Sequence, residues 1–229
     1  MTVYHLLQVC ILVVLLSTSW YGANFSLSYL ITYLITSSLV VCFLDDCYKR
    51  DGRKWPYFQQ LLIWKWFVAY FDGGISVETP LDSQQQYIFC SFPHGTCTAS
   101  HLLTMTNGCG MLDKVHGGDR RDLCATVLFF VPVFREMLLW LGCVDAGTRT
   151  AHHNLKCGRS ILIFVGGEKE QLMTTPGVHQ IFLNNRKGFV KLALEYGSPL
   201  VPMYAFGENE VFHVSKLFMG TCCCSFIFA

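Results

Sequence analysis

Apolar residues dominate the start of the chain. The first 44 residues contain no Asp, Glu, Lys or Arg. Two mostly apolar stretches, Val3–Trp20 and Phe25–Leu44, are each long enough to cross a hydrocarbon core, which requires about 20 helical residues. Interfacial aromatics and turn formers separate the two stretches. The pattern therefore predicts a transmembrane helical hairpin over residues 1–44.

Basic residues after the second stretch set the orientation. Lys49, Arg50, Arg53 and Lys54 follow it closely, and positive charge beside a span favours the cytosol. The N-terminus and the remainder of the chain are therefore expected on that side. A cleaved signal peptide over Met1–Ser19 is the alternative. It would lack a basic n-region and a small-x-small cleavage site, and it would leave the second apolar stretch unexplained.

Residues 45–78 are predicted to form a basic linker followed by an aromatic segment. Trp55–Phe71 is rich in Trp, Tyr and Phe, but two glutamines and Lys65 make it too polar for a third span. The pattern suits a helix lying in the headgroup layer, and it suits an ordinary core helix equally well. The soluble domain is expected to cover residues 79–229.

Short apolar runs alternate with amphipathic segments in that domain. Runs typical of strands buried in a sheet lie at Tyr87–Cys90, Ser160–Val165 and Leu200–Tyr204. Arg186–Tyr196 has the apolar face of a helix, with Gly197 as its expected C-cap. Leu123–Leu141 is predicted to form two helical pieces broken at Pro132. This alternation predicts an α/β fold with a largely parallel sheet.

Composition narrows the function classes. Hydrophobic residues make up 52% of the chain and charged ones 14%, with a formal net charge of +1, so a nucleic-acid partner is not expected. The twelve cysteines contain no Cys-x-x-Cys pair and are interpreted as reduced, buried thiols. No metal site is expected.

One imidazole stands at the end of an apolar strand. His94 follows the run Tyr87–Cys90, and Pro93 and Gly95 on either side of it end the strand. Histidine is the usual general base for a hydroxyl near neutral pH. A helix is expected to start within Gly95–Met105, capped by its own Thr or Ser side chains, and its first N–H groups would steady an oxyanion. A capping or core histidine is the alternative.

A second candidate loop follows the run at Ser160–Val165. Gly166 and Gly167 come next, and Glu168 and Glu170 follow them. Glycines and carboxylates at the end of a buried strand are typical of a ligand-facing loop in α/β proteins.

Four sequence blocks occur in order behind the hairpin. They are Tyr-Ile-Phe…Phe-Pro-His-Gly (87–95), Val-Gly-Gly-Glu-Lys-Glu (165–170), Asn-Arg-Lys-Gly-Phe-Val-Lys-Leu-Ala-Leu (185–194) and Val-Pro-Met-Tyr-Ala-Phe-Gly-Glu-Asn-Glu (201–210). Together they resemble the diacylglycerol acyltransferase type 2 family, which also contains monoacylglycerol and wax-alcohol acyltransferases. The resemblance extends from the hairpin to about Glu210.

The resemblance implies a glycerolipid-acyltransferase-like α/β domain on the cytosolic side of the endoplasmic reticulum membrane, and also at lipid droplets. Such an enzyme transfers a fatty acyl group from acyl-CoA, without a further cofactor, to the hydroxyl of diacylglycerol, giving triacylglycerol. Monoacylglycerol and a wax alcohol are the alternative acceptors. The bilayer and these substrates are the expected partners, and the oligomeric state, a homo-oligomer included, is left open.

The chain departs from the family pattern at two positions. The His-Pro-His-Gly signature is matched from Pro93 to Gly95, but Phe92 stands where its first histidine is usual, as in plant members. The His-x4-Asp pattern of glycerolipid acyltransferases is not met, because Ala99 occupies the aspartate position. The group that orients His94 must therefore come from elsewhere.

The resemblance assigns a role to each block. His94 is the expected base, and Glu170 is expected to orient the imidazole or to bind the acceptor. The expected substrate-binding residues are Pro93, Gly95, Gly166, Gly167, Arg186, Lys187, Glu208, Asn209 and Glu210. Arg186 and Lys187 would pair with CoA phosphates, with a solvated helix face as the alternative. The glutamates at 208 and 210 are otherwise surface charges, and no role is expected for His101.

A covalent mechanism is a further alternative. Cys97 lies three residues beyond His94, so on a helix the two side chains would meet. That pairing would permit a Cys–His nucleophile and an acyl-enzyme intermediate. Direct attack by the lipid hydroxyl is preferred here.

The C-terminal sequence opens a second functional class. Soon after Glu210 the chain reaches Thr221–Ala229 and stops, whereas members of the family usually continue. The domain over residues 79–229 is therefore expected to be incomplete at its C-terminus, with an uncovered strand edge and part of the pocket missing. An inactive membrane scaffold is the resulting alternative.

A microsomal assay with labelled acyl-CoA separates the enzyme from the scaffold. We expect this chain to form labelled neutral lipid, as a C-terminally extended version would. Activity confined to the extended version would favour the scaffold.

Overall fold

The computed structural model describes residues 44–115, 118–213 and 227–228. The predicted hairpin therefore lies outside the described residues, apart from Leu44. Within the described ranges, no helix combines the length and the apolar character needed to cross a bilayer.

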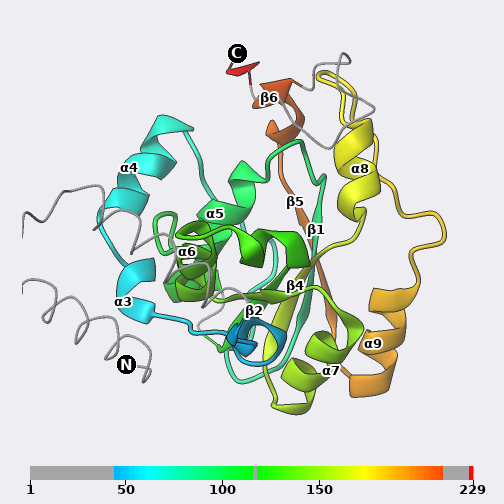
Figure 1. Cartoon of the computed structure of the whole chain (residues 1–229). Helices are drawn as coiled ribbons and strands as arrows, with labels where there is room; N and C mark the ends of the chain where they lie inside the picture. Colours follow the sequence, from blue (N-terminus) through cyan, green and yellow to red (C-terminus); the bar gives the residue numbers. More distant parts are fainter. Residues whose placement is uncertain (1–43, 116–117, 214–226, 229) are drawn as a thin grey trace, which may run out of the picture.

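A five-stranded parallel sheet lies at the centre of the domain, in the order β3-β2-β4-β1-β5 (Figure 1). Its strands are β1 (Ile88–Phe92), β2 (Arg120–Cys124), β3 (Cys143–Asp145), β4 (Ser160–Phe164) and β5 (Leu200–Tyr204). Cys90 of β1 lies opposite Ile163 of β4 and Pro202 of β5. The predicted parallel sheet and the three predicted strands are confirmed. All five strands end at one edge of the sheet, here called the carboxyl edge.

Helices cover both faces of this sheet (Figure 1). One face carries α3 (Pro56–Gln59), α4 (Ile63–Tyr70), α5 (Ala99–Met105) and α6 (Phe134–Leu141), and the other carries α7 (Thr148–Lys156) and α9 (Gly188–Tyr196). The remaining elements are α8 (Gly167–Met173), the short helices η1 (Cys47–Lys49), η2 (Met111–Val115), η3 (Thr126–Phe130) and η4 (Glu208–Glu210), and the antiparallel pair β6 (Phe212–His213) and β7 (Ile227–Phe228). Each face has its own core. Leu139 of α6 and Phe129 of η3 belong to one core, and Ile88 and Ile161 lie in the other, beneath α7 and α9.

The predicted amphipathic helix is confirmed as α9. Its apolar residues, among them Phe189 and Leu192, pack against the core that contains Ile161. Gly197 ends the helix in the left-handed region, at a φ of 61°, as expected of a glycine C-cap.

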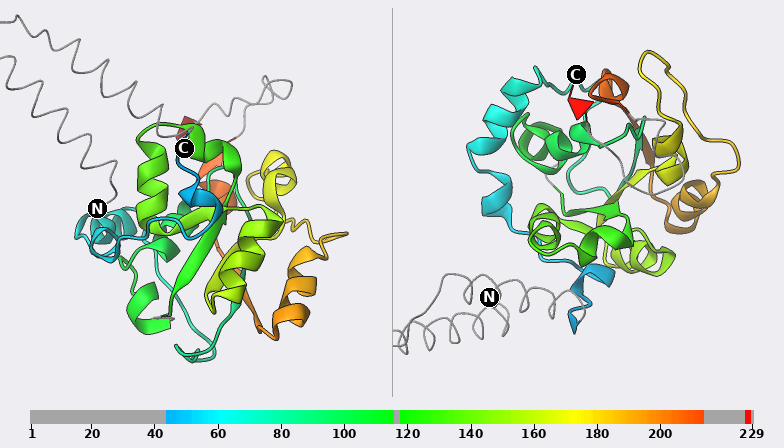
Figure 2. Two further views of the ribbon diagram at one scale, coloured as in Figure 1. Left: turned by 60° about the horizontal axis from the view of Figure 1, so that its bottom comes forward. Right: turned by 45° about the horizontal axis from the view of Figure 1, so that its top comes forward.

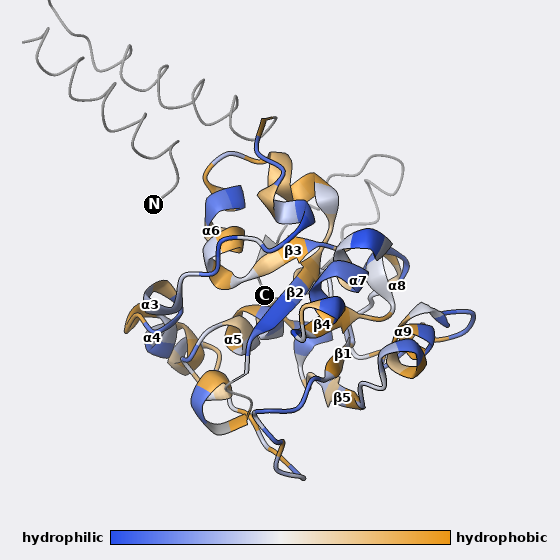
Figure 3. Cartoon of the chain, turned by 90° about the horizontal axis from the view of Figure 1, so that it is seen from below, coloured by the Kyte–Doolittle hydropathy of each residue, from blue (hydrophilic) through white to orange (hydrophobic). Residues whose placement is uncertain are grey.

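Strand β2 differs from the apolar strands around it. Arg120, Arg121 and Asp122 are buried, and β2 is accordingly drawn in blue in Figure 3. Buried charges are tolerated where they are paired, and Arg120 donates two hydrogen bonds to Asp122, at 2.7 and 3.0 Å. The predicted first helical piece of Leu123–Leu141 is wrong at its start, because Leu123 and Cys124 belong to β2. The two helical pieces on either side of Pro132 are confirmed as η3 and α6.

The aromatic segment Trp55–Phe71 forms two short helices rather than one. The break falls at Gln60, between α3 and α4. Trp64 is buried, whereas Trp66 and Tyr70 are exposed on α4. The segment thus contributes to the core and also exposes aromatic side chains.

The basic linker packs against the domain. Arg135, which is fully buried at the start of α6, donates from Nη2 to the carbonyl of Asp45 at 2.8 Å. Arg53 pairs with Glu136, the neighbour of Arg135, at 2.8 Å. Because α6 follows the end of β2, these contacts hold the chain just after Leu44 at the carboxyl edge.

Candidate active site

His94 lies at the carboxyl edge, directly beyond the end of β1. The chain then forms α5 on one face of the sheet, whereas the chain that leaves the neighbouring strand β4 reaches α9 on the other face. In open α/β sheets, ligands bind where adjacent strands send their connections to opposite faces. His94 and the Gly166–Gly167 loop both occupy that position.

The ring of His94 is oriented by a backbone carbonyl. Nδ1 lies 3.1 Å from the carbonyl oxygen of Gly95, and a carbonyl only accepts, so Nδ1 carries the proton. In the neutral ring, Nε2 is then unprotonated and carries a lone pair. The ring also contacts Phe164 of β4, with 5.1 Å between centroids. Burial lowers the pKa of His94, and the bond to Gly95 and the charge of Glu170 oppose this shift.

Glu170 contacts the backbone of His94. Its carboxylate, which is only 4% exposed, accepts the His94 backbone N–H at 2.5 Å and the Phe182 backbone N–H at 2.8 Å. The group that orients the imidazole in this structure is thus Gly95, while Glu170 holds two loops together. A Cβ on Gly166 would lie 2.1 Å from Glu170 Oε2, so a glycine is required there.

Glu208 supports the same segment from the end of β5. It is 4% exposed and accepts the backbone N–H groups of Ala99 and Ser100 at 2.9 and 2.8 Å. Burial raises the pKa of Glu208, and these hydrogen bonds oppose the shift. A Cβ on Gly95, whose φ is +64°, would lie 2.6 Å from Glu208 Cγ. We predicted that Glu208 either binds the substrate or is a surface charge. In the structure it is buried and caps the start of α5.

Two details of the predicted helix start are wrong. The helix begins at Ala99, and its N-cap residue Thr98 makes no side-chain capping bond, because Glu208 supplies the acceptors. The N–H groups of Ala99 and Ser100 are therefore already paired and do not await an oxyanion. Cys97 precedes the helix, so the helical pairing with His94 that motivated a covalent mechanism does not occur.

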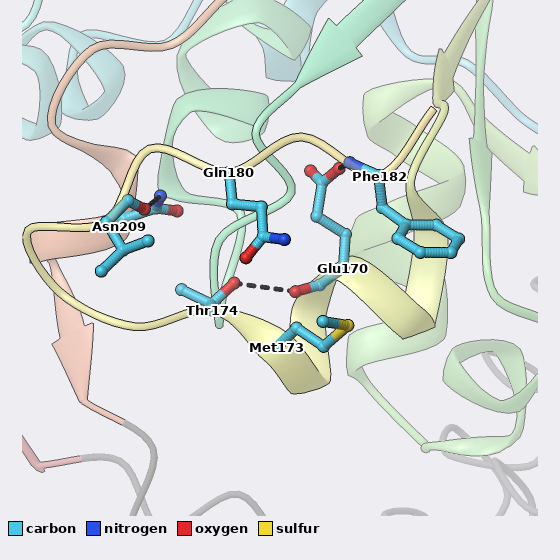
Figure 4. Close-up of a pocket in the computed structure, with 7 residues that line it drawn as sticks. Glu170, Met173, Thr174, Gln180, Phe182 and Asn209 are labelled. Atoms are coloured by element: carbon cyan, nitrogen blue, oxygen red, sulfur yellow. Dashed lines mark hydrogen bonds between the residues drawn. The ribbon is translucent and has the colours of Figure 1, made fainter. Parts of the chain in front are cut away.

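The remaining residues of the block near Glu208 hold the loop after α8. Asn209 is buried and donates to the carbonyl of Val178 at 2.9 Å, while the exposed Glu210 accepts the Gly177 N–H at 3.3 Å. Between this loop and Glu170 lies a cavity of about 10 Å³ (Figure 4). That volume has room for about one water molecule and not for a lipid chain.

The other predicted substrate residues lie at the same edge. Arg186 donates from Nη2 to the carbonyl of Gly166 at 3.0 Å, which ties the residues before α9 to the Gly166–Gly167 loop. Lys187 is exposed at the N-cap of α9, and Pro93 is buried beside His94. The role of Arg186 and Lys187 toward CoA phosphates stays a prediction.

A buried network that the sequence did not reveal lies behind Phe164. His101 Nε2 is 3.0 Å from Asp122 Oδ2, and the His101 ring contacts Phe164 at 4.8 Å between centroids. Although burial alone would raise it, the Arg120 charge and the His101 hydrogen bond hold the pKa of Asp122 at about 2. Phe164 therefore packs between two imidazoles, His94 and His101. The sequence signal that could have revealed this network is the run of charged residues Arg120, Arg121 and Asp122 directly before the apolar Leu123.

Among the described residues, Asp51, His153 and Cys157 form a group of potential metal ligands, with their ligand atoms within 4.8 Å of one another. The group lies at the C-terminal end of α7, away from the carboxyl edge. Asp51 is already paired with Arg159, whose positive charge opposes a cation. We interpret the group as an ion-pair cluster.

The domain is thus a parallel α/β protein in which a backbone carbonyl orients the imidazole of His94 at the carboxyl edge. A family model described as Diacylglycerol acyltransferase matches residues 24–225. The chain belongs to this family.

Curated relatives agree with this membership. Diacylglycerol O-acyltransferase 2 of Dictyostelium discoideum is 31% identical over 74% of this chain and 52% of the relative. Diacylglycerol O-acyltransferase 2 of Homo sapiens is 36% identical over 72% of this chain and 43% of the relative, and 2-acylglycerol O-acyltransferase 3 of Homo sapiens is 29% identical over 80% and 55%. The chain spans about half the length of the curated relatives it matches. No solved structure is significantly similar to it.

Replacing Gly166 by Ala tests the role of the buried carboxylate. The added Cβ would displace Glu170 and leave the His94 N–H without its acceptor, so we expect a loss of about 1–3 kcal/mol in stability. Gly188→Ala is the matched control, because a Cβ at that glycine meets nothing within 4 Å. Thermal unfolding in detergent micelles provides the comparison. Equal melting temperatures for the two variants would contradict the role given to Glu170.

Proposed function

We propose that this chain is a membrane-bound O-acyltransferase that transfers a fatty acyl group from acyl-CoA to the free hydroxyl of diacylglycerol, giving triacylglycerol. The observation that carries the proposal is the state of His94. Its Nδ1 donates to the Gly95 carbonyl, so Nε2 is unprotonated in the neutral ring, and burial favours that neutral ring.

The reaction follows from this geometry. Nε2 of His94 takes the proton of the acceptor hydroxyl while the alcohol oxygen attacks the thioester carbonyl. A tetrahedral oxyanion forms, and its collapse breaks the carbon–sulfur bond. The departing CoA thiolate takes the proton back from Nε2, so the imidazole is regenerated. The donors to the oxyanion must be groups other than the N–H groups of Ala99 and Ser100, which Glu208 occupies.

Monoacylglycerol is the second candidate acceptor. It is supported by the similarity to a 2-acylglycerol O-acyltransferase, which matches over 80% of this chain. A wax alcohol is a third. The class of product lipid formed in cells that lack storage lipid distinguishes these acceptors.

His94→Ala tests the proposed base. We expect it to lower the acylation rate by about 10²–10⁴-fold, the usual contribution of general base catalysis. Cys97→Ala is the control and should retain nearly full activity, because a lipid hydroxyl and not a thiol is the nucleophile. Incorporation of labelled acyl-CoA into neutral lipid by microsomes measures both variants. A silent Cys97→Ala variant beside an active His94→Ala variant would reverse the assignment.

The same base sets the pH dependence. Catalysis needs neutral His94, and a lowered pKa keeps the ring neutral to more acidic pH. The activity should therefore hold through neutral pH and fall on an acid limb below the ordinary histidine value of 6.5. An acid limb centred above that value would contradict this environment.

We also propose that the chain is anchored in the endoplasmic reticulum membrane through residues 1–44, with the α/β domain in the cytosol, and that it reaches lipid droplets. The support is the apolar sequence of those residues and the basic residues that follow. Extraction of microsomes with alkaline carbonate should leave the full-length chain in the pellet. Release of a chain shortened at its N-terminus would favour the signal peptide.

A further inference from the structure

An apolar rim lies at the carboxyl edge, where β2 connects to α6. We define it by six large hydrophobic side chains that are exposed: Leu44, Val127, Phe130, Val131, Val133 and Phe134. The exposed fractions of Leu44, Val133 and Val127 are 79%, 78% and 67%. Single exposed hydrophobic residues are ordinary, but a contiguous group marks an interaction surface.

The rim is continuous across the two segments that form it. Phe130 contacts Tyr48 of η1 edge to face, with 6.2 Å between ring centroids. Arg135 binds the carbonyl of Asp45, the residue after Leu44. Leu44 is thereby held next to the β2–α6 connection.

Val133 is held in an unfavourable backbone conformation. Its φ is +68°, a region that β-branched residues rarely adopt, and its side chain is largely exposed rather than packed in the core. Strain of this kind is characteristic of functional sites, where the surroundings over-determine the conformation. Here it presents an aliphatic side chain outward at the rim.

The apolar stretch that precedes the domain indicates what covers the rim. The apolar stretch Phe25–Leu44 ends at Leu44, and 43 residues precede that position. Because Asp45 is fixed to Arg135, an apolar segment long enough to span a bilayer meets the domain at the rim.

A cationic cavity adjoins the rim. It has a volume of about 430 Å³, and it is lined by Asp46, Lys49, Arg50, Asp145, Gly147, Thr148, Arg149 and Thr150. Thr126, at the start of η3, donates to Asp145 at 2.5 Å and so links the cavity to the rim. Asp46 is paired with Lys49 at 2.6 Å, and Asp145 also accepts the Gly147 N–H. Within the part of the chain that the structure describes, neither Arg50 nor Arg149 forms a salt bridge.

Apolar side chains next to unpaired arginines match the boundary between acyl chains and phosphate headgroups. We infer that the carboxyl edge is the face with which the domain docks on the lipid bilayer, with the rim among the acyl chains and Arg50 and Arg149 at the lipid phosphates. His94 lies at the same edge. The acceptor lipid then reaches it from the plane of the membrane, a step that rests on the proposed function.

The exposed aromatics of α4 offer a different docking surface. Trp66 and Tyr70 are residues of α4. This helix belongs to the layer that covers one face of the sheet and is not a connection at the carboxyl edge (Figure 2). If the domain docked through α4, a face of the sheet with its helix layer would lie toward the bilayer, and not the carboxyl edge. The two surfaces therefore predict different lipid contacts.

Site-specific photo-crosslinking in the full-length chain tests the inference. A photoreactive side chain is placed in turn at Val127 and Val133 of the rim, at Trp66, and at Leu194, an exposed leucine of α9 that serves as the control. We expect lipid adducts in microsomes at both rim positions and none at Leu194. Adducts at Trp66 without adducts at the rim, or rim adducts to protein instead of lipid, would overturn the inference.

The cross-linking readout does not depend on catalysis. Rim adducts in a chain that transfers no acyl group would leave the docking face standing and refute the proposed function. Acyl transfer without rim adducts would refute the docking face alone. Adding Arg149→Ala should reduce the adducts at Val133, whereas Lys156→Ala, at the far end of the same helix, should not.

Discussion

Two buried carboxylates hold the segment that carries His94. Glu170 and Glu208 come from the segments that follow β4 and β5, and each accepts two backbone N–H groups. A buried charge is costly unless hydrogen bonds satisfy it, and a hydrogen bond to a charged group contributes about 1.5–3 kcal/mol. Glu170 reaches the backbone of His94 from the segment after β4, and Glu208 reaches the backbone of Ala99 and Ser100 from the segment after β5. The position of the imidazole therefore depends on the pairing of β1 with both strands.

This arrangement explains why glycines surround the site. Gly95 and Gly166 each lie against one of the two glutamates, and a Cβ at either position would meet carboxylate atoms within 3 Å. The glycines of the two sequence blocks thus make room for buried acids. Their neighbour Phe164 completes the packing, since it lies between the rings of His94 and His101.

Much of the fold could be predicted because its strands are apolar and its helix α9 is amphipathic. Strand β2 could not be predicted, because charged residues such as Arg120 and Asp122 are typical of an exposed segment. Only the structure shows that they pair with each other. The site was predictable as a place, with His94 beyond a strand and Gly166 beyond another. The acceptor of the His94 ring proton was not, because a backbone carbonyl carries no sequence signal. The cap of α5 was equally hidden, since Glu208 lies more than a hundred residues from the helix it caps.

The contact between Arg135 and Asp45 also has a mechanical consequence. The residues that follow Leu44 contact α6 and β3, which is an edge strand of the sheet and lies three positions away from β1. A pull or tilt applied at the N-terminal end of the domain would load this outer strand first. His94, beyond the end of β1, is therefore separated from the residues that follow Leu44 by most of the width of the sheet.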